Sequence, residues 1–456
     1  MTATIDTDYV VIGAGAAGMA FADALVAHSD ATVTLADTRD APGGHWHDAY
    51  PFVRLHQASP FYGVASTMLG GARQRGGPED GLLERATGAE VLEYYATVLR
   101  DVLEPTGRVE FLPATRVEPD RTWVNVATGA RGRIGPTTRI VDARLLSPTV
   151  PSTTPAPWEV DDGSRVVPVG DLASHDPAGP FVIVGSGKTA TDGIVHLVSR
   201  GTDPSRITWV RPRDPWMLDR AHVQPDAAVF QAMTATVLEE AERAPDLDGL
   251  FAALERAGIM MRLDTSVTPT MAKAPTLGRW ELELLRSVED VVRLGRLRTS
   301  APGLLRMTGG DVRIPREATV VHCAADGLRR PRRTPVWSRD AITLQTVRAG
   351  FPCFGAALIG YVEATRSSDD DKNLLCPPNA YGDSLADWAL MTLRGADAVA
   401  GFMSEPDIAA WAHSTALNPA RVTDPDAPGV AEARARASRA LPGARRALAA
   451  FAGVSA

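Results

Sequence analysis

Cysteine is scarce in this sequence, and its scarcity excludes several kinds of functional site. The 456 residues contain three cysteines, Cys323, Cys353 and Cys376, and these form neither a CxxC nor a CxxxxC pair. Redox-active dithiols and zinc sites built on paired cysteines are therefore unsupported, and we expect no metal site. So few cysteines in a chain of this length also indicate a protein of the reducing cytoplasm rather than a secreted one.

Long apolar runs and concentrated positive charge are missing as well. No run of about 18 apolar residues is present, so we expect no transmembrane helix. The N-terminal segment MTATIDTDYVVIG lacks the basic stretch and the apolar segment of a signal peptide, which again favours a cytoplasmic protein. The net charge is -8 and the arginines are scattered, so nothing indicates a nucleic-acid or membrane partner.

The overall composition is that of an ordinary globular protein, with 45% hydrophobic and 22% charged residues. Its length suffices for two or three domains with sizeable cores. Residues 145–160 carry four prolines among hydroxyl residues, which predicts a connector and a domain boundary. Thr87 and Glu90 have capping-box spacing, and apolar residues at helical spacing from Val91 to Val102 predict a helix with one buried face.

The segment YVVIGAGAAGMAFA, residues 9–22, predicts a dinucleotide-binding turn. Gly13, Gly15 and Gly18 form GxGxxG directly after a short apolar strand and at the start of an Ala-rich helix. The first glycine permits a tight turn, the second lets the backbone approach a pyrophosphate, and the third permits close packing of helix on strand. The helix N-terminus attracts the phosphates. Asp37 ends the next strand, where an acidic side chain binds a ribose hydroxyl.

The segment FVIVGSGKTATDGI, residues 181–194, contains a GKT that suggests a triphosphate-binding loop at first sight. Such a loop requires GxxxxGK[ST], but Val182 stands where the first glycine is required and belongs to the apolar strand. Read from its first glycine, the same stretch fits GxGxxG/A between a strand and a helix, which predicts a second dinucleotide site. The residues assigned to this turn are Gly185, Gly187, Lys188, Thr189 and Ala190.

The strand after the second turn, ITWV, ends in Arg211 instead of an acidic residue. An acidic side chain there would repel a 2′-phosphate, whereas an arginine pairs with it through charge-assisted hydrogen bonds. Arg213 provides a second cation close by. The second site is therefore predicted to bind NADPH in preference to NADH, with an arginine that merely lies on the surface as the alternative interpretation.

Taken in their order along the chain, GAGAAG, GGHW and GSGKTATD resemble the flavin-containing monooxygenase and Baeyer–Villiger monooxygenase superfamily of flavoproteins with two dinucleotide domains. The resemblance spans the chain from its start to about residue 215 and, more loosely, to about residue 400. It implies that FAD binds at the first turn, held by Gly13, Gly15, Gly18 and Asp37. Gly44 and Trp46 would then lie near the ribityl side of the flavin, and residues 54–63 near the isoalloxazine ring.

The chain departs from the superfamily at its identifying element, F-x-G-x-x-x-H-x-x-x-[FYW], expected between the connector and the second turn. Gly163 has neither the Phe before it nor the His after it that this element requires, and His175 lacks the flanking pattern. In the superfamily the element links the pyridine nucleotide to oxygen chemistry at the flavin. The chain is therefore identified as a divergent member.

The segment that follows the second FAD signature supplies the candidate catalytic residues His56, Gln57 and Ser59. We expect these side chains to border the flavin, with His56 hydrogen-bonded to the flavin or its peroxide; a histidine that only packs is the alternative. We expect Asp219 and Arg220 to form a surface ion pair, with a position facing the nicotinamide or substrate as the alternative. We expect the apolar residues 342–364 to form part of the core instead of lining an access channel. Residues 373–389 are expected to return to the flavin or to line a substrate cleft, with a loop before a helix capped by Ser384 as the alternative.

The predicted fold is α/β, with two Rossmann-like dinucleotide-binding domains, the NADPH domain inserted in the FAD domain, and a C-terminal helical region. The predicted boundaries are residues 1–150 for the first part of the FAD domain, 151–325 for the NADPH domain with a helical segment at 226–298, 326–402 for the return of the FAD domain, and 403–456 for the helical tail. The tail arginines at 434, 436 and 439 are expected on a solvated helix face.

The resemblance implies an FAD-dependent monooxygenase that consumes NADPH and O2 and acts on a small organic substrate. NADPH passes a hydride to flavin N5, and a flavin C4a-(hydro)peroxide then hydroxylates nitrogen or sulfur, or inserts oxygen beside a carbonyl. The alternative is an FAD/NAD(P)H oxidoreductase that does not oxygenate: a reductase, dehydrogenase or oxidase. The absence of a CxxxxC pair removes disulfide reductases from that group. A non-catalytic flavoprotein that senses redox state or binds a partner is a third class.

Overall fold

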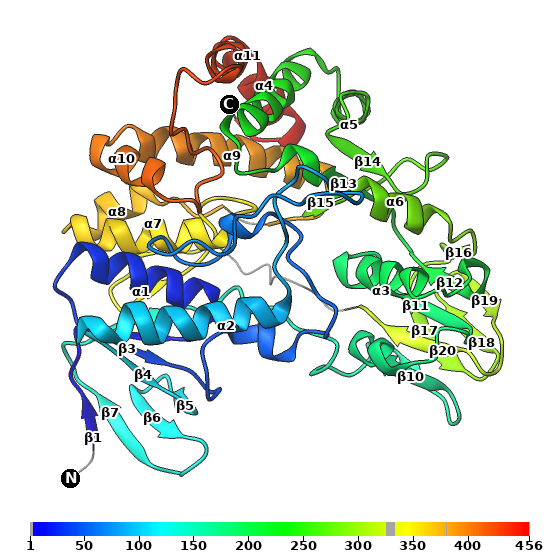
Figure 1. Ribbon diagram of the computed structural model, residues 1–456, viewed down its shortest axis with the longest axis horizontal. Coiled ribbons are helices and arrows are strands. Elements are labelled where there is room, and N and C mark those ends of the chain that lie inside the picture. The colour runs from blue at the N-terminus through cyan, green and yellow to red at the C-terminus, as the bar shows by residue number, and fades with distance from the viewer. Residues whose placement is uncertain (1–2, 325–332, 380, 456) are drawn as a thin grey trace.

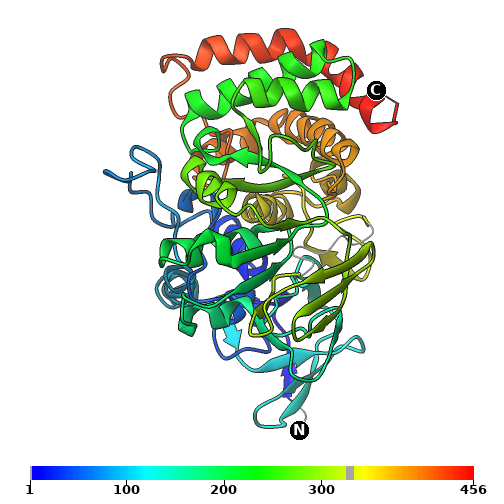
Figure 2. The same cartoon turned by 90° about the vertical axis from the view of Figure 1, so that its right-hand side faces the viewer.

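The computed structural model describes residues 3–324, 333–379 and 381–455. Two parallel sheets occupy the left and the right of Figure 1, and helices from the middle and the C-terminal part of the chain gather at the end opposite the N-terminus (Figures 1 and 2). Within the described ranges, no helix combines the length and the apolar character needed to cross a membrane.

The first sheet has five parallel strands in the order β21-β8-β2-β3-β4. These strands are β2 (Tyr9–Ile12), β3 (Val33–Ala36), β4 (Val109–Leu112), β8 (Arg139–Asp142) and β21 (Ala341–Thr343). Most are short runs rich in Val, Ile and Leu, as expected of strands covered on both faces. Helices α1 (Ala16–His28) and α7 (Pro352–Thr365) pack against each other. Gly360 permits their close approach, because a Cβ on it would lie 2.4 Å from the carbonyl oxygen of Phe21.

The second sheet is also parallel and has the order β10-β20-β11-β12-β16. Its strands are β10 (Arg165–Pro168), β11 (Phe181–Val184), β12 (Ile207–Val210), β16 (Val291–Val292) and β20 (Thr319–His322). Helix α3 (Lys188–Ser199) follows β11 and packs against α6 (Arg279–Arg286). All five strands lie between β8 and β21 in the sequence, so the second unit is inserted in the first. The predicted fold class is confirmed, whereas the residue-by-residue boundaries of the domains stay a prediction.

Three smaller sheets flank the parallel ones, in the orders β1-β7-β6-β5, β14-β13-β15 and β19-β18-β17-β9. Their strands are β1 (Ala3–Ile5), β5 (Thr115–Val117), β6 (Thr122–Asn125), β7 (Arg131–Ile134), β9 (Glu159–Val160), β13 (Pro215–Asp219), β14 (Met260–Arg262), β15 (Met271–Leu277), β17 (Leu297–Ala301), β18 (Leu304–Met307) and β19 (Gly310–Arg313). Strands β14 and β15 interrupt the segment that was predicted to be mainly helical. They form because both pair with β13, a tertiary contact that composition does not reveal.

Helices cover the end of the molecule opposite the N-terminus (Figure 2). They are α4 (Ala227–Arg243), α5 (Leu247–Arg256), α9 (Leu385–Met403), α10 (Pro406–Ser414) and α11 (Val430–Ala452). Helix α8 (Asp369–Leu375) lies beside α7 and contacts α9. Helix α11 packs against α4 and α9. Arg434 and Arg439 are exposed as predicted, but Arg436 forms an ion pair of 2.6 Å with Glu239 of α4 and so helps to fix the tail.

Several local predictions are confirmed by the hydrogen bonds and the burial of these elements. Helix α2 (Gly88–Val98) begins at a capping box, in which Thr87 accepts from the backbone of Glu90 and the Glu90 carboxylate accepts from the backbone of Thr87. Helix α7 is buried around most of its circumference, as expected of core. Ser384 caps α9 through Asp387.

Candidate active site

The first glycine turn lies at the carboxyl end of β2 and has the geometry that its motif predicts. Gly13 has a φ of +107°, a region that favours glycine. Gly18 lies so close to the turn that a Cβ on it would be 1.9 Å from the carbonyl oxygen of Gly13. Asp37 is buried, and its carboxylate accepts a 2.8 Å hydrogen bond from the backbone N–H of Ala14. The predicted acidic residue therefore lies directly beside the predicted phosphate turn.

The second FAD signature packs directly on the first turn. The backbone N–H of Gly43 donates to the carbonyl of Ala14 at 2.9 Å. A Cβ on Gly44 would lie 2.9 Å from the Cα of Gly15, so only glycine leaves this approach free. Trp46 is buried in the core and donates from its indole to the hydroxyl of Tyr62 at 2.6 Å. The two glycine signatures thus form one backbone surface at the edge of the first sheet.

The second glycine turn lies at the carboxyl end of β11 and repeats this arrangement. Gly185 has a φ of +143°, and a Cβ on it would lie 3.0 Å from the carbonyl oxygen of Cys323 at the end of β20. Gly187 directly precedes α3, and Ala190 is fully buried where the helix meets the sheet. Lys188 and Thr189 are partly exposed in the first turn of the helix. The backbone N–H groups at this helix start are the donors that a pyrophosphate uses.

Lys188 has a partner of its own. Its ammonium group donates to both carboxylate oxygens of Asp192, at 2.7 and 2.5 Å, and the Tyr50 hydroxyl donates to the same carboxylate at 2.6 Å. Sequence reasoning missed this group, although an acidic residue four positions after a lysine on a helix is a recognisable signal. Tyr50 comes from the segment after the second FAD signature, so the contact joins that segment to the helix of the second glycine turn.

The prediction that Arg211 contacts a 2′-phosphate disagrees with its environment. Only 2% of the residue is exposed; its guanidinium lies 2.8 Å from the carboxylate of Asp214 and 4.2 Å from the ring centre of Trp209. Burial lowers the pKa of Arg211 to about 10. Arg213 is the exposed cation of the pair, although it too forms an ion pair, at 2.8 Å with Asp383. Arg211 therefore supports the end of β12 from inside.

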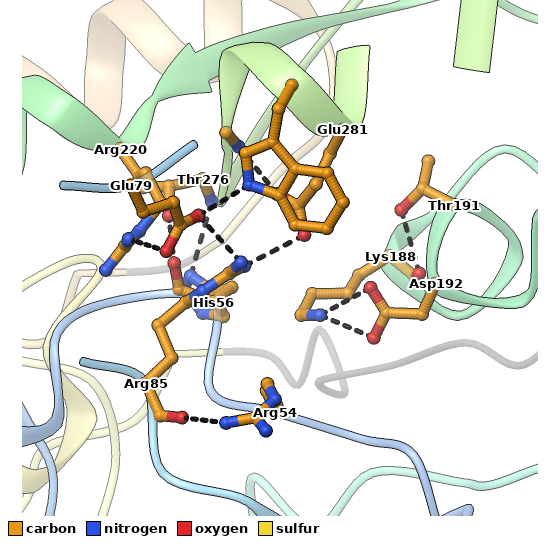
Figure 3. Close-up of polar contacts among 12 residues, drawn as sticks. Arg54, His56, Glu79, Arg85, Lys188, Thr191, Asp192, Arg220, Thr276 and Glu281 are labelled. Atoms are coloured by element: carbon orange, nitrogen blue, oxygen red, sulfur yellow. Dashed lines mark hydrogen bonds and ion pairs between the residues drawn. The ribbon is translucent and has the colours of Figure 1, made fainter. Parts of the chain in front are cut away.

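His56 lies between the two units (Figure 3). The backbone N–H of Thr276, on β15, donates to its Nδ1 at 3.3 Å, which leaves the proton of the neutral ring on Nε2. Burial and the neighbouring cations Lys188, Arg85 and Arg220 lower the pKa of His56 to about 3. The imidazole is therefore neutral at physiological pH and offers an N–H donor, not an exchangeable positive charge.

The other two candidate catalytic residues do not face an open space. The Ser59 hydroxyl donates to the carbonyl of Glu84 at 3.1 Å and accepts from the N–H of Ala86 at 2.9 Å, and the residue is fully buried. Gln57 has an exposed fraction of 4%. Ser59 joins its own segment to the backbone of Glu84 and Ala86, and Gln57 is part of the interior; contact of either side chain with the flavin stays a prediction.

A buried network of charges surrounds His56 on one side (Figure 3). Arg85 pairs with Glu79 at 2.8 Å and with Glu281 at 3.0 Å, and Arg220 pairs with Glu79 and donates to the carbonyl of Leu83. Arg220 has no exposed surface, so the surface ion pair considered from the sequence is wrong for this residue. The network joins a segment of the first unit to the turn after β13 and to α6 of the second.

The chain is similar to known proteins in sequence and in fold. Residues 11–61, around the first turn, match the family model described as an NAD(P)-binding Rossmann-like domain. The uncharacterized protein Rv2000 of Mycobacterium tuberculosis strain H37Rv is 39% identical over 419 residues, which are 91% of this chain and 78% of that protein. The uncharacterized protein Mb2023 of Mycobacterium bovis has the same identity and coverage.

One solved structure carries the likeness in fold. The open crystal structure of cyclohexanone monooxygenase superposes with a TM-score of 0.50 at 16% identity, over 78% of this chain and 88% of that one. At this identity the comparison shows a likeness of fold.

Proposed function

The chain belongs to the family of these mycobacterial proteins, and from this premise and its fold we propose that it is an FAD- and NADPH-dependent oxidoreductase that oxygenates a small organic substrate. The observation that supports the proposal most directly is the pair of glycine turns at the carboxyl edges of two parallel sheets. Such turns at the topological switch of a parallel sheet bind dinucleotides. His56 lies near Lys188 of the second turn (Figure 3).

The residues at the first turn fit FAD. Gly15 and Gly44 leave a strip of bare backbone that a Cβ would fill, and the N-terminus of α1 faces the same turn. We propose that this strip and Gly13 receive the pyrophosphate, that Asp37 binds the adenosine ribose, and that Gly18 keeps α1 close to β2. Trp46 supports this surface from the core.

The second turn fits a pyridine nucleotide. We propose that the backbone at Gly185 and Gly187, with Lys188 and Thr189, binds its pyrophosphate, while Ala190 provides the close helix packing. Arg213 takes the place predicted for Arg211 as the contact to a 2′-phosphate, because its guanidinium is exposed and its ion pair with Asp383 lies at the surface end of the strand.

Bound FAD would accept a hydride from NADPH and supply the oxygen chemistry. The chain's own part is positional. His56 offers its Nε2–H as a fixed neutral donor at the junction of the two units, because Thr276 holds Nδ1, and burial together with the surrounding cations lowers the ring's pKa and keeps it uncharged. The buried network of Glu79, Arg85, Arg220 and Glu281 holds the two units in register around that donor (Figure 3).

The test is NADPH oxidation by the purified FAD-loaded protein under ¹⁸O2, with a panel of small ketones, amines and sulfides. We expect at least one compound to accelerate NADPH oxidation and to carry one labelled oxygen atom. Release of hydrogen peroxide as the sole oxygen product would overturn the oxygenase assignment.

An FAD oxidoreductase that does not oxygenate is the second candidate, favoured by the missing F-x-G-x-x-x-H element. It predicts anaerobic turnover with an artificial electron acceptor and no label in any product. Bound FAD that NADPH does not reduce would instead favour the non-catalytic flavoprotein.

A further inference from the structure

Arg348 lies at the carboxyl edge of the first sheet, between the end of β21 and the start of α7. Its segment lies directly on the first turns of α7: a Cβ on Gly355 would be 3.4 Å from the backbone N of Val347 and 3.5 Å from that of Arg348. The side chain is thus anchored by a short, closely packed connection at the same edge of the sheet as the first glycine turn.

Arg348 differs from the other deep arginines in having no counter-ion. Arg85, Arg211 and Arg220 each pair with a carboxylate, whereas no carboxylate among the described residues lies within ion-pair distance of Arg348. Burial lowers its pKa to about 10, yet the residue remains partly exposed. It therefore lies deep in the protein with a face that solvent or a ligand reaches. An uncompensated deep cation is costly unless a ligand supplies the negative charge.

The strand order places Arg348 where the flavin end of a dinucleotide would reach. Asp37 follows β3 and the glycine turn follows β2, so adenosine and pyrophosphate at these two strands leave the rest of the molecule to extend over β8 toward β21. Neighbouring strands are about 4.8 Å apart, so β21 is roughly 10 Å from β2. The N-terminus of α7, with its partial positive charge, begins at the same place.

We propose that Arg348 is the positive group that binds the flavin's N1–C2=O edge and neutralises the charge which that edge gains on reduction. The proposal rests on the proposed FAD site. Transfer of a hydride from NADPH to flavin N5 moves two electrons and one proton, and leaves NADP⁺ and a reduced flavin with one negative charge shared by N1 and the C2 oxygen. Arg348 stays protonated throughout and stabilises the reduced form more than the oxidised form.

The experiment compares Arg348→Met with Arg339→Met in the FAD-loaded full-length protein. Arg339 is exposed before the amino end of β21, so the two variants lose the same charge at opposite ends of one strand. The readouts are the dissociation constant of oxidised FAD and the two-electron midpoint potential of the bound flavin, measured by dye equilibration. We expect Arg348→Met to lose at least tenfold in affinity for reduced FAD relative to oxidised FAD, which is a potential lower by about 30 mV. Arg339→Met should match the wild type.

A potential in Arg348→Met equal to that of Arg339→Met overturns the proposal, as does an equal loss of affinity for both redox forms. Arg348→Lys keeps the charge and should restore most of the potential. If Arg348→Met does not fold, the comparison of Arg348→Lys with Arg348→Gln carries the same test. Failure of the wild type to bind FAD at all would instead overturn the proposed function, so the two failures are distinguishable.

Discussion

At the scale of single residues, His56 shows how neighbouring charges decide what a side chain can do. Its pKa falls from an ordinary value of 6.5 to about 3 through burial and nearby cations. Between these two pH values the unfolded chain binds a proton at this position that the folded protein does not bind. The contribution of His56 to the free energy of unfolding is therefore fully present above pH 6.5. It is lost as the pH falls toward 3, by up to about 1.4 kcal/mol per pH unit.

We expect His56→Gln to remove this contribution. Urea unfolding at a series of pH values should show a shallower loss of the free energy of unfolding between pH 6.5 and 5 in the variant than in the wild type. Parallel curves for the two proteins would show that the folded histidine titrates normally.

Gly44 tests whether the two glycine signatures act as one surface. Gly44→Ala adds a Cβ 2.9 Å from the Cα of Gly15 at a φ of +58°. Gly76 has a φ of +78° with open space around it, so Gly76→Ala carries the backbone cost of about 1–2 kcal/mol without a clash. We expect both variants to lose stability in chemical unfolding, but only Gly44→Ala to lose FAD affinity, measured by the quenching of flavin fluorescence. Equal FAD affinity in both variants would show that Gly44 does not contribute to FAD binding.

Arg213 is the residue that should decide between the two pyridine nucleotides. We expect Arg213→Ala to raise KM for NADPH roughly tenfold to a hundredfold, since charge-assisted hydrogen bonds contribute about 1.5–3 kcal/mol, and to leave KM for NADH unchanged. Arg206, exposed at the amino end of β12, is the matched control. A loss for NADH of the same size would show that Arg213 does not contact the 2′-phosphate.

The glycines were predictable from the sequence because their motif describes local backbone geometry. The positive φ of Gly13 and the close packing of Gly18 follow from spacing between a strand and a helix. Arg211 was not predictable in the same way, because its burial depends on Trp209 and Asp214 folding around it. Ser59 likewise looked reactive by position, whereas its hydroxyl is bonded to the backbone of a distant segment.

At the scale of elements, the buried network links a loop of the first unit to the turn after β13 and to α6. Glu79 is its centre, with ion pairs to Arg85 and Arg220; burial opposes its ionisation, but these partners lower its pKa overall. Glu79→Gln leaves one buried arginine charge without compensation. We expect a loss of about 3–5 kcal/mol in the free energy of unfolding, measured with urea.

The matched control for this change is Glu118→Gln, which breaks an exposed ion pair of 2.7 Å with Arg116. It should leave the unfolding midpoint essentially unchanged. Similar losses in the free energy of unfolding for the two substitutions would mean that the buried network stabilises the fold no more than an exposed ion pair does. The network itself was beyond sequence reasoning, because Glu79 and Glu281 are brought together only by the folding of two units.

At the scale of the whole molecule, the insertion of the second sheet between β8 and β21 makes the two units interdependent. The chain must pass from the first sheet to the second and back, and the network of Glu79 and Arg220 closes the junction. We expect calorimetry to show a single unfolding peak. FAD at 100 times its Kd should raise the stability of that entire transition by about 2.7 kcal/mol. Two peaks, of which FAD moves only one, would contradict this.

The order of the motifs was enough to predict the inserted fold, since a second GxGxxA after the first complete strand–turn–helix–strand unit implies a second sheet. The three strands β13, β14 and β15 were not predicted. Their pairing brings Thr276 to His56, so the part of the fold that the sequence did not reveal is also the part that fixes the candidate catalytic ring.

The carboxylate of Asp192 accepts hydrogen bonds from two parts of the molecule: Lys188 of the second turn and Tyr50 of the first unit. A phosphate that binds Lys188 would break the contact between Lys188 and Asp192, and Asp192 would keep only its hydrogen bond from Tyr50. A ligand that displaces Tyr50 would have the opposite effect. On the proposed function, the two bound nucleotides would therefore influence each other, and the factor by which one changes the affinity of the other would be the same in both directions. Lys188, the lysine of the GKT sequence, would then couple the two proposed nucleotide sites through Asp192.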